Sequence, residues 1–411
     1  MKHSFVMKLQ LINVESSRYP KPSDLSGWCP PIGLLTMATE LKDYDVEVLD
    51  TQVDDNIKLD GDVVGLSCGV LSYPDALEMA QEAKEKGATV VMGGPYVSRI
   101  ARKIDRPYVD HIVIGDGTPT LEKLLKGRYP DRIEQKDIDL RLKPIPDRGL
   151  VDLSRYWRNY LGPYDRPTSM VPQMGCVYRE LKGCIFCSVG KDFTKRHAYD
   201  FWQEYANLES LGVDYVSIQA EDLLGNKAWF DEVHERRPER NVPMEVIARA
   251  DRLDREYMQK LSDINVKKIF IGVESGSQRM LDRSRKGLTL ENIEGAVKLM
   301  KEYDIKSKLT FVLGLPGEDN STLNKTLDFA EHLCKRGDVE TIGASIMTPV
   351  PGSPAYRLFI NRYPKYSRDD VFPIETSKIL WVDGFCRTDY KTIEKATNYL
   401  RRLTDSFGFA S

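Results

Sequence analysis

The sequence predicts an α/β protein in two parts: a doubly wound, Rossmann-like parallel domain, then a partial (β/α)6 barrel with a small helical C-terminal cap. In both halves, short apolar runs alternate with stretches of helical periodicity, the pattern of parallel strands joined by helices. The chain has 411 residues, more than one hydrophobic core usually serves. We place the first domain at residues 1–133, a linker at 134–167, the barrel at 168–360 and the cap at 361–411.

The first domain contains five expected strands separated by helical segments. This order predicts a five-stranded parallel sheet covered by helices on both faces. The strands are expected at Leu9–Val14, Val46–Leu49, Val63–Ser67, Thr89–Met92 and His111–Ile114, and the helices at Gly33–Lys42, Pro74–Lys86 and Thr118–Lys126. The stretch from Glu134 to Pro167 is rich in charge, proline and aromatic residues and has no clear period, so we expect an interdomain linker there.

The second half repeats the alternation six times. Strands are expected at Val171–Met174, Tyr215–Gln219, Met244–Ala248, Lys268–Val273, Lys308–Leu313 and Thr341–Met347. Helices are expected at His197–Leu211, Lys227–Arg237, Asp254–Ile264, Leu290–Tyr303 and Ser321–Lys335, with a further amphipathic helix near Tyr390–Thr404. Six such steps predict an open barrel with its chemistry at the carboxyl ends of the strands.

The bulk composition narrows the class of partner. The 59 basic and 62 acidic residues leave a net charge of −3, so no overall basic field points to nucleic acid or to a membrane surface. Met1–Leu11 holds no apolar run long enough for a signal peptide, and no later stretch reaches the roughly 18 apolar residues of a membrane span. We therefore expect a cytoplasmic protein without a nucleic-acid or membrane partner.

Three of the seven cysteines, Cys176, Cys184 and Cys187, lie in one short segment after the first expected barrel strand. This grouping suits metal ligation in a reducing compartment better than a disulfide framework. Three thiolates can hold three irons of a [4Fe–4S] cluster and leave the fourth iron open to a small chelating ligand. The alternative is a zinc knuckle without its fourth ligand, with His197 as a possible recruit.

The cysteine segment resembles the cluster motif of the radical S-adenosylmethionine (SAM) enzymes. That family has three cysteines at this place, with an aromatic residue before the last one, and Phe186 stands at that position. The spacing is C-x7-C-x2-C where the family usually has C-x3-C-x2-C, so the first loop is longer. The resemblance implies that the amino and carboxyl groups of SAM chelate the open iron.

Further motifs of the same family follow along the barrel. The segment Gly272–Ser277 resembles a strand motif whose acidic residue meets the SAM ribose hydroxyls, which implies that role for Glu274, with Ser275 beside it. Arg249 stands where the family places a basic residue toward the SAM carboxylate. For Glu274 or Arg249 taken singly, a structural ion pair is the alternative.

Three more barrel segments match the family, the first of them loosely. Gln219–Asp222, which contains Glu221, stands where the family has an acidic pair near the SAM ammonium. Phe311–Glu318, which contains Gly314, and Pro349–Pro354 match the motifs that line the adenine pocket. The resemblance therefore implies that Glu221 and Gly314 contribute to SAM binding.

Small residues follow three expected strands of the first domain. Small residues at strand ends let a bulky ligand approach the backbone, although each glycine can also simply make a tight turn. The candidate residues are Ser67 and Gly69 after the third strand, Gly93, Gly94 and Pro95 after the fourth, and Gly115, Asp116 and Gly117 after the fifth.

With Trp28–Leu35 and Val46–Asp50, these motifs resemble the cobalamin-binding domain that precedes the barrel in many radical SAM methyltransferases. The resemblance spans about residues 8–355 and implies that the small residues contact cobalamin, with Asp116 in place of the commoner glutamate. Cobalamin proteins that ligate cobalt through histidine have an Asp-x-His-x-x-Gly loop after the first strand. Val14–Asp24 contains no histidine, which suits a methyl carrier.

The combined resemblance implies a C-methyltransferase. One SAM would methylate cobalamin, and a second would yield the 5′-deoxyadenosyl radical that removes hydrogen from an unactivated sp3 carbon. The length, tail and cysteine spacing look most like the methanogen enzymes that methylate a glutamine in the alpha chain of methyl-coenzyme M reductase. We expect the substrate to be the alpha chain of methyl-coenzyme M reductase, as a protein or a peptide. We expect the electron donor to be a ferredoxin or flavodoxin. The alternatives are a small natural product or lipid precursor as substrate, a non-methylating cobalamin-dependent radical enzyme, and a carrier without turnover.

Overall fold

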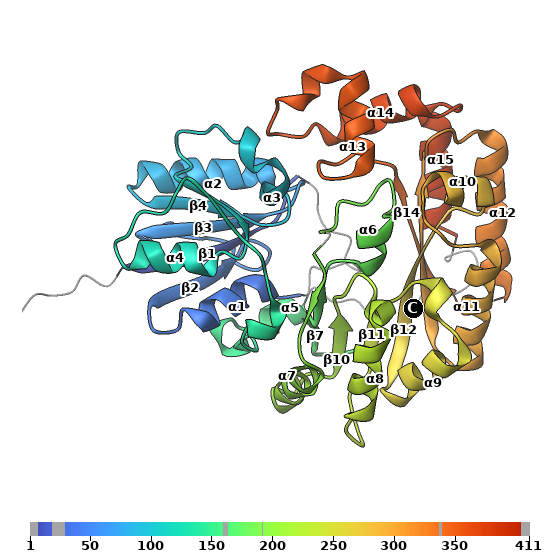
Figure 1. Cartoon of the computed structure of the whole chain (residues 1–411), viewed down its shortest axis with the longest axis horizontal. Helices are drawn as coiled ribbons and strands as arrows, with labels where there is room; N and C mark the ends of the chain where they lie inside the picture. The colour runs from blue at the N-terminus through green and yellow to red at the C-terminus, as the bar shows by residue number, and fades with distance from the viewer. Residues whose placement is uncertain (1–6, 19–28, 159–162, 191, 337–338, 404–411) are drawn as a thin grey trace, which may run out of the picture. The chain divides into compact units, whose positions relative to one another are not determined.

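A computed structural model describes residues 7–18, 29–158, 163–190, 192–336 and 339–403 (Figure 1). The chain divides into two compact units. The first comprises Met1–Ser169 together with Lys365–Phe372, and the second comprises Met170–Pro364 together with Pro373–Ser411. A short segment near the C-terminus therefore belongs to the first unit, whereas the sequence predicted that all of 361–411 caps the barrel.

The first unit is built on a parallel sheet with the strand order β2-β1-β3-β4-β5-β6. Its strands are β1 (Lys8–Val14), β2 (Asp45–Asp50), β3 (Val63–Cys68), β4 (Thr89–Gly93), β5 (His111–Gly115) and β6 (Ile133–Lys136). The order reverses at β1, and in doubly wound sheets ligands bind beyond the carboxyl ends of the strands at such a switch point. The doubly wound parallel fold is thereby confirmed.

The expectation of only five strands was wrong. The sixth strand, β6, pairs with β5 inside the stretch predicted to be a linker. It is short, polar and largely exposed, so it carries no apolar period that could reveal it.

Described residues of the expected linker after β6 also contact the first unit. Lys143 Nζ lies 2.7 Å from Glu40 Oε2 and 2.7 Å from Asp116 Oδ2, and the Tyr156 hydroxyl donates to Asp50 Oδ2 at 3.1 Å. The helices of this unit are α1 (Ile32–Glu40), α2 (Tyr73–Glu85), α3 (Val97–Ile100), α4 (Thr118–Leu125) and α5 (Ser154–Trp157).

The second sheet has the order β14-β13-β12-β11-β10-β7, which ends at β14 and β7 and so forms the expected open barrel; it lies in the second unit except for the first three residues of β7, which are grouped with the first. Its strands are β7 (Pro167–Met170), β10 (Tyr215–Ile218), β11 (Met244–Ile247), β12 (Val266–Glu274), β13 (Lys306–Leu313) and β14 (Val339–Ile346). The first barrel strand was predicted at Val171–Met174, but it lies just before that range, at Pro167–Met170. Pro172 interrupts that run, and Gln173–Met174 forms a separate strand, β8, which pairs antiparallel with β9 (Thr194–Lys195).

Helices follow the strands of the second unit, five of them where the sequence predicted them and one, Gln278–Arg283, where it predicted none. They are α7 (Ala198–Ser210), α8 (Lys227–Glu235), α9 (Arg255–Asp263), α10 (Gln278–Arg283), α11 (Leu290–Glu302) and α12 (Asn320–Arg336), with the short α6 (Val177–Leu181) in the cysteine loop. The C-terminal helices are α13 (Pro354–Arg362), α14 (Ile374–Phe385) and α15 (Tyr390–Arg401). Two of these pack on the barrel: Arg401 Nε donates to Ala344 O of β14 at 2.9 Å, and the buried Trp381 of α14 donates to Gly314 O at 2.9 Å.

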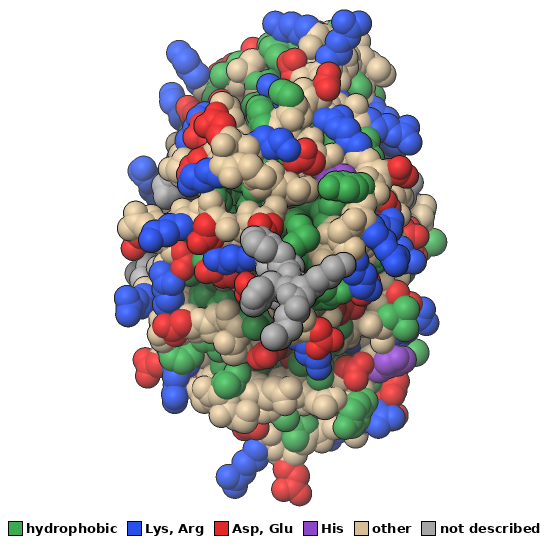
Figure 2. Space-filling model, turned by 90° about the vertical axis from the view of Figure 1, so that its left-hand side faces the viewer, with side chains coloured by type: hydrophobic (Ala, Val, Ile, Leu, Met, Phe, Trp, Pro, Cys, Tyr) green, Lys and Arg blue, Asp and Glu red, His purple; other side chains and the backbone are tan. Residues whose placement is uncertain are grey.

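The described surface carries charges of both signs, as the nearly balanced composition predicts (Figure 2). Figure 2 shows acidic and basic side chains interspersed over the described part of the face that it presents, not gathered by sign. No helix among the described residues is long and apolar enough to cross a membrane.

Candidate cluster and cofactor sites

The cysteine loop follows the short strand β8. Gly175, which precedes Cys176, has φ +84°, and a Cβ there would lie 2.4 Å from Asp192 O, so this turn requires glycine. Cys176 is the N-cap of α6, and this helix accommodates the extra residues of the C-x7-C spacing. Cys187 N donates to Cys184 O at 3.2 Å, and Val189 N donates to Cys187 Sγ at 3.4 Å. The three cysteines thus lie on one loop, with a backbone donor aimed at one sulfur.

Burial affects the protonation of two of the three thiols. Burial raises the pKa of Cys184 to about 11, against the positive charge of Lys286. Burial also raises the pKa of Cys187, against a hydrogen bond from Val189 N. Free thiols at these sites are therefore protonated at neutral pH, and a bound metal must displace their protons.

The arrangement fits an iron–sulfur cluster better than a single zinc ion. Among the described residues, no three His, Cys, Asp or Glu side chains gather closely enough to hold one metal ion. A [4Fe–4S] cluster takes one thiolate per iron, so its cysteines need not converge on a point. His197, the possible zinc ligand, is exposed at the N-cap of α7.

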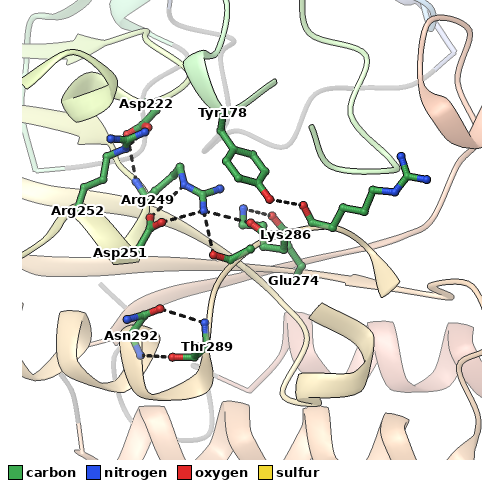
Figure 3. Close-up of polar contacts among 11 residues, drawn as sticks. Tyr178, Asp222, Arg249, Asp251, Arg252, Glu274, Lys286, Thr289 and Asn292 are labelled. Carbon is green, nitrogen blue, oxygen red and sulfur yellow. Dashed lines mark hydrogen bonds and ion pairs between the residues drawn. The ribbon is translucent and has the colours of Figure 1, made fainter. Parts of the chain in front are cut away.

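Charged side chains from the carboxyl ends of the barrel strands meet beside this loop (Figure 3). Lys286 Nζ lies 2.7 Å from Glu274 Oε1, and both side chains are buried. Arg249, which follows β11, donates from Nε and Nη2 to the two carboxylate oxygens of Asp251 at 3.0 Å each. Arg249 Nη2 also donates to Lys286 O at 3.1 Å, so the predicted residues Arg249 and Glu274 share one network.

The aromatic ring of Tyr178 ties the cysteine loop to this network. The Arg249 guanidinium lies 4.1 Å from the centre of the Tyr178 ring, a cation–π contact. The Tyr178 hydroxyl donates to Arg285 O at 2.8 Å. A Cβ at Gly287 would lie 2.4 Å from the Tyr178 hydroxyl oxygen, so only glycine leaves room for the ring there.

Glu274 sits in a backbone conformation that side chains rarely adopt. Its φ is +66°, and the register between β12 and β13 shifts between Gly272 and Glu274. Strained backbone of this kind occurs mostly where a functional side chain must be aimed. The shift directs the Glu274 carboxylate toward Lys286 (Figure 3).

The other residues predicted to bind SAM lie in different surroundings. Gly314 has φ +82° and follows β13, and its predicted place in the adenine pocket stays a prediction. Ser275 is fully buried, and its hydroxyl lies 2.9 Å from Thr326 Oγ1, so it supports the fold. Phe186 is half-buried beside Cys187.

The two acidic residues that follow β10, Glu221 and Asp222, make different contacts. Burial raises the pKa of Glu221, against a hydrogen bond from Gly175 of the cysteine loop. Asp222 accepts from Arg252 Nε at 2.7 Å and from Arg249 N at 3.3 Å. Asp222, not the predicted Glu221, therefore belongs to the charged network.

The predicted cobalamin residues occupy the ends of β3, β4 and β5. A Cβ added at Gly69 would meet only Ser72 Oγ at 4.0 Å, and one at Gly93 would make ordinary contacts with Val113 at 3.8 Å. A Cβ at Gly94, whose φ is +99°, would lie 2.8 Å from the Cys68 backbone. Gly69 and Gly93 are therefore not required by close packing, whereas the tight turn accounts for Gly94. Ser67 lies beside Gly94 and Pro95 follows it.

The residues of the motif after β5 mostly make contacts within the protein that stabilise the fold. A Cβ at Gly115 would lie 2.1 Å from Lys136 O of β6, and one at Gly117 would lie 3.2 Å from Met37 Sδ. Asp116 is buried and paired with Lys143. The tight-turn alternative thus explains Gly115, and Asp116 holds the segment that follows the sheet.

Sequence reasoning missed Lys286 and Tyr178. Tyr178 lies inside the longer cysteine loop, and that extra length was the available signal. Lys286 follows a short helix, α10, with no periodicity that marks a site. Its only signal was the glycine after it, which the Tyr178 ring requires.

Family models match both units. Residues 170–330 match the radical SAM superfamily, and residues 24–125 match the B12 binding domain. The sequence is 23% identical to an uncharacterized methyltransferase, PH0819, of Pyrococcus horikoshii over 92% of this chain and 87% of that protein. It is 24% identical to bacteriochlorophyllide d C-8(2)-methyltransferase of Chlorobaculum tepidum over 79% of this chain and 74% of that protein.

Two solved structures share the fold. The radical SAM methyltransferase TsrM of Kitasatospora setae, with cobalamin and a [4Fe–4S] cluster bound, matches with a TM-score of 0.68 and 19% identity over 87% of this chain and 75% of that chain. The cobalamin-dependent SAM radical enzyme OxsB, with aqua-cobalamin bound, matches with a TM-score of 0.71 and 18% identity over 98% of this chain and 68% of that chain.

These matches and the geometry of the loop define the class of protein. The chain is a cobalamin-dependent radical SAM enzyme, with a B12-binding domain followed by a radical SAM barrel. A [4Fe–4S] cluster, SAM and cobalamin are its cofactors, as the sequence predicted.

Proposed function

We propose that this enzyme is a C-methyltransferase that methylates an unactivated sp3 carbon. The observation that carries the proposal is the presence of a B12-binding domain and a radical SAM domain in one chain. The chain's likeness to PH0819, called a methyltransferase, over nine-tenths of its length supports it. When bound, the cluster with SAM supplies a 5′-deoxyadenosyl radical, and cobalamin supplies the methyl group.

The residues of the chain bind and orient these groups. Cys176, Cys184 and Cys187 would hold the cluster, and Glu274 would hold the ribose of SAM. Gly69 and Gly93, which lack a side chain, would let cobalamin approach the backbone at the carboxyl ends of β3 and β4. The protein's contribution to the rate is to align the reacting atoms and to exclude water and other hydrogen donors. We assign no general base.

For the substrate, we propose a glutamine in a peptide segment of the methyl-coenzyme M reductase alpha chain. The C-x7-C-x2-C spacing, which builds helix α6, supports this choice because it resembles that of the methanogen enzymes. The reaction would then be a post-translational modification in a methanogen. We place it in the cytoplasm with a ferredoxin or flavodoxin as reductant, since the cluster needs a low-potential electron and a reducing compartment.

The test is a single-turnover assay with SAM that carries a deuterated methyl group. The reconstituted protein is incubated with cobalamin, a reductant and a peptide that spans the candidate glutamine. We expect a trideuteromethyl mass gain on glutamine, with one S-adenosylhomocysteine and about one 5′-deoxyadenosine per product. A matched peptide with asparagine at the target position is the control.

The outcomes separate the levels of the proposal. Methylation of a natural product or lipid precursor instead of the peptide would overturn the substrate and retain the reaction. Turnover that releases 5′-deoxyadenosine but transfers no methyl group to any candidate would favour a non-methylating radical enzyme. OxsB, described as a radical enzyme, makes that the second candidate.

A further inference from the structure

Lys286 is a buried cation that the proposed reaction does not use. Its residue is 9% exposed, and its ammonium donates to Glu274 Oε1 at 2.7 Å. A Cβ at Gly272 would lie 2.7 Å from Lys286 Nζ and 2.4 Å from Glu274 Oε1, so glycine at 272 leaves room for the pair. Burying two charges is costly unless they pair closely. The chain thus provides a dedicated space for this ion pair.

The lysine is held from both sides by groups that belong to the cofactor site. Arg249 Nη2 donates to Lys286 O, and Tyr178 of the cysteine loop donates to Arg285 O. Ile185 N, next to Cys184, donates to Ser284 O at 2.9 Å. The loop that carries Lys286 is therefore bonded directly to the cysteine loop (Figure 3).

The charges around Lys286 balance one another, with three cations and three carboxylates. The charged groups of the network are Glu274 from β12, Arg249 and Asp251 from the turn after β11, and Asp222 with Arg252. Asp251 neutralises Arg249, and Arg252 neutralises Asp222. Lys286 compensates Glu274, and its charge also acts on the Cys184 thiol. Removing only the lysine would leave a buried carboxylate uncompensated near the cluster ligands.

We propose that Lys286 is a positioning residue that links SAM binding to the reduction potential of the cluster. Its ammonium fixes Glu274 Oε1. In the described part of the chain Oε2 has no hydrogen-bond partner, so it can accept from the ribose hydroxyls of SAM. Its positive charge near Cys184 favours the reduced, more negative cluster. The proposal rests on the predicted contact of Glu274 with SAM and does not depend on methyl transfer.

The test uses the reconstituted full chain without a methyl acceptor. Two quantities are measured: SAM affinity by equilibrium dialysis, and the cluster midpoint potential by a redox titration followed by spin resonance. Lys286→Met should weaken SAM binding about tenfold or more, because Glu274 is no longer held in place for its hydrogen bonds to the ribose hydroxyls. It should also make the midpoint potential more negative, because a cation is lost. Lys286→Arg keeps the charge and should retain most of the wild-type potential.

Two further variants separate the charge from the packing. Lys308→Met removes another lysine of the same barrel that is 9% exposed; its ammonium lies 5.5 Å from the Phe270 ring, and it should change neither quantity. The double variant Glu274→Gln with Lys286→Met removes both charges, so its potential should return toward wild type while SAM binding stays weak.

The double variant also replaces the single variant if Lys286→Met does not hold iron. Wild-type SAM affinity in either variant would overturn the positioning role. A wild-type potential in an iron-replete Lys286→Met protein, or a strongly shifted one in the double variant, would overturn the electrostatic role. These readouts involve no methyl acceptor, so a failed methyltransferase assay leaves them intact.

Discussion

At the scale of single residues, the glycines of the first unit divide into two groups that the sequence could not separate. Gly94 and Gly115 are required by the fold, because a side chain there would meet backbone atoms of Cys68 and Lys136. At Gly69 an added Cβ would meet only Ser72 Oγ, at 4.0 Å. A glycine after a strand looks the same in both cases, since close approach is decided by residues far away in the sequence.

This division predicts two different losses. Gly69→Val should leave the first unit folded and reduce cobalamin binding, because the side chain would hinder the approach of cobalamin to the backbone. Gly94→Ala should destabilise the unit itself by about 1–3 kcal/mol, since it adds a clash at positive φ. An absorbance titration with hydroxocobalamin and a urea unfolding curve distinguish them. Equal stability losses in both variants would contradict the assignment.

Glu318 makes the stability of the barrel pH-dependent. Burial raises its pKa to about 7 from 4.5, against hydrogen bonds from Gly314 N and Leu315 N. Because the folded-state pKa is raised, the contribution is fully present below pH 4.5 and is lost as the pH rises through about 7. Over this window, stability should fall by up to about 1.4 kcal/mol per pH unit. Glu318→Gln should flatten that slope in urea midpoints; an unchanged slope would refute the role.

At the scale of elements, the sequence located most of the regular strands and helices of both units, but not α10, α13 or α14. Apolar periodicity carried that information, and it failed where an element is short or polar, as in β6, β8 and α6. The cofactor site was predicted in part for a similar reason. Cys184, Arg249 and Glu274 follow motifs, whereas Lys286 and Tyr178 reach the site through tertiary packing, which leaves no periodic trace.

Helix α6 is predicted to stabilise the cluster through Tyr178. Tyr178→Phe removes the hydrogen bond to Arg285 O, worth about 0.5–1.5 kcal/mol, and keeps the ring over Arg249. Tyr178→Ala removes both contacts and leaves a gap beside Gly287. The rate of iron loss to a chelator should rise slightly in the first variant and several-fold in the second. Identical rates in all three proteins would show that the helix is only a spacer.

Replacing Cys176, Cys184 and Cys187 together with alanine tests the loop as a whole. The triple variant should lose its iron and its charge-transfer absorbance, because no thiolate remains to hold the cluster. The first unit should stay folded and still bind hydroxocobalamin, since these cysteines lie in the second unit. Iron retention at the wild-type level would disprove the ligand assignment.

At the scale of the whole molecule, the chain passes from the first unit to the second and then returns for one segment, Lys365–Phe372. Asp370 binds this segment to the rest of the first unit. Its carboxylate accepts from Arg106 Nε at 2.9 Å and Nη2 at 2.8 Å and from the Tyr73 hydroxyl at 3.1 Å, and its carbonyl accepts from the Tyr96 hydroxyl at 2.6 Å. Tyr96 follows the Gly93–Pro95 motif, so the anchor lies next to predicted cobalamin residues.

Asp370→Asn should loosen this anchor. Burial alone would raise the pKa of Asp370, but the hydrogen bonds and charge of Arg106 outweigh it and hold the pKa below its usual range. The contribution is therefore present at neutral pH and is lost as the pH falls through the lowered pKa. The variant should lose about 1.5–3 kcal/mol of stability in the first unit at pH 7.

The measurement is limited trypsin digestion, read by mass spectrometry. Cleavage after Lys365 and Arg368 should become faster in the variant, because the segment leaves its site before the unit unfolds. Glu82→Gln, which breaks the exposed pair with Lys86, is the matched control and should leave the cleavage rate unchanged, since exposed pairs contribute little. If Asp370→Asn is cut no faster than this control, the ion pair does not anchor the segment, and the Tyr96 hydrogen bond to the backbone must be sufficient.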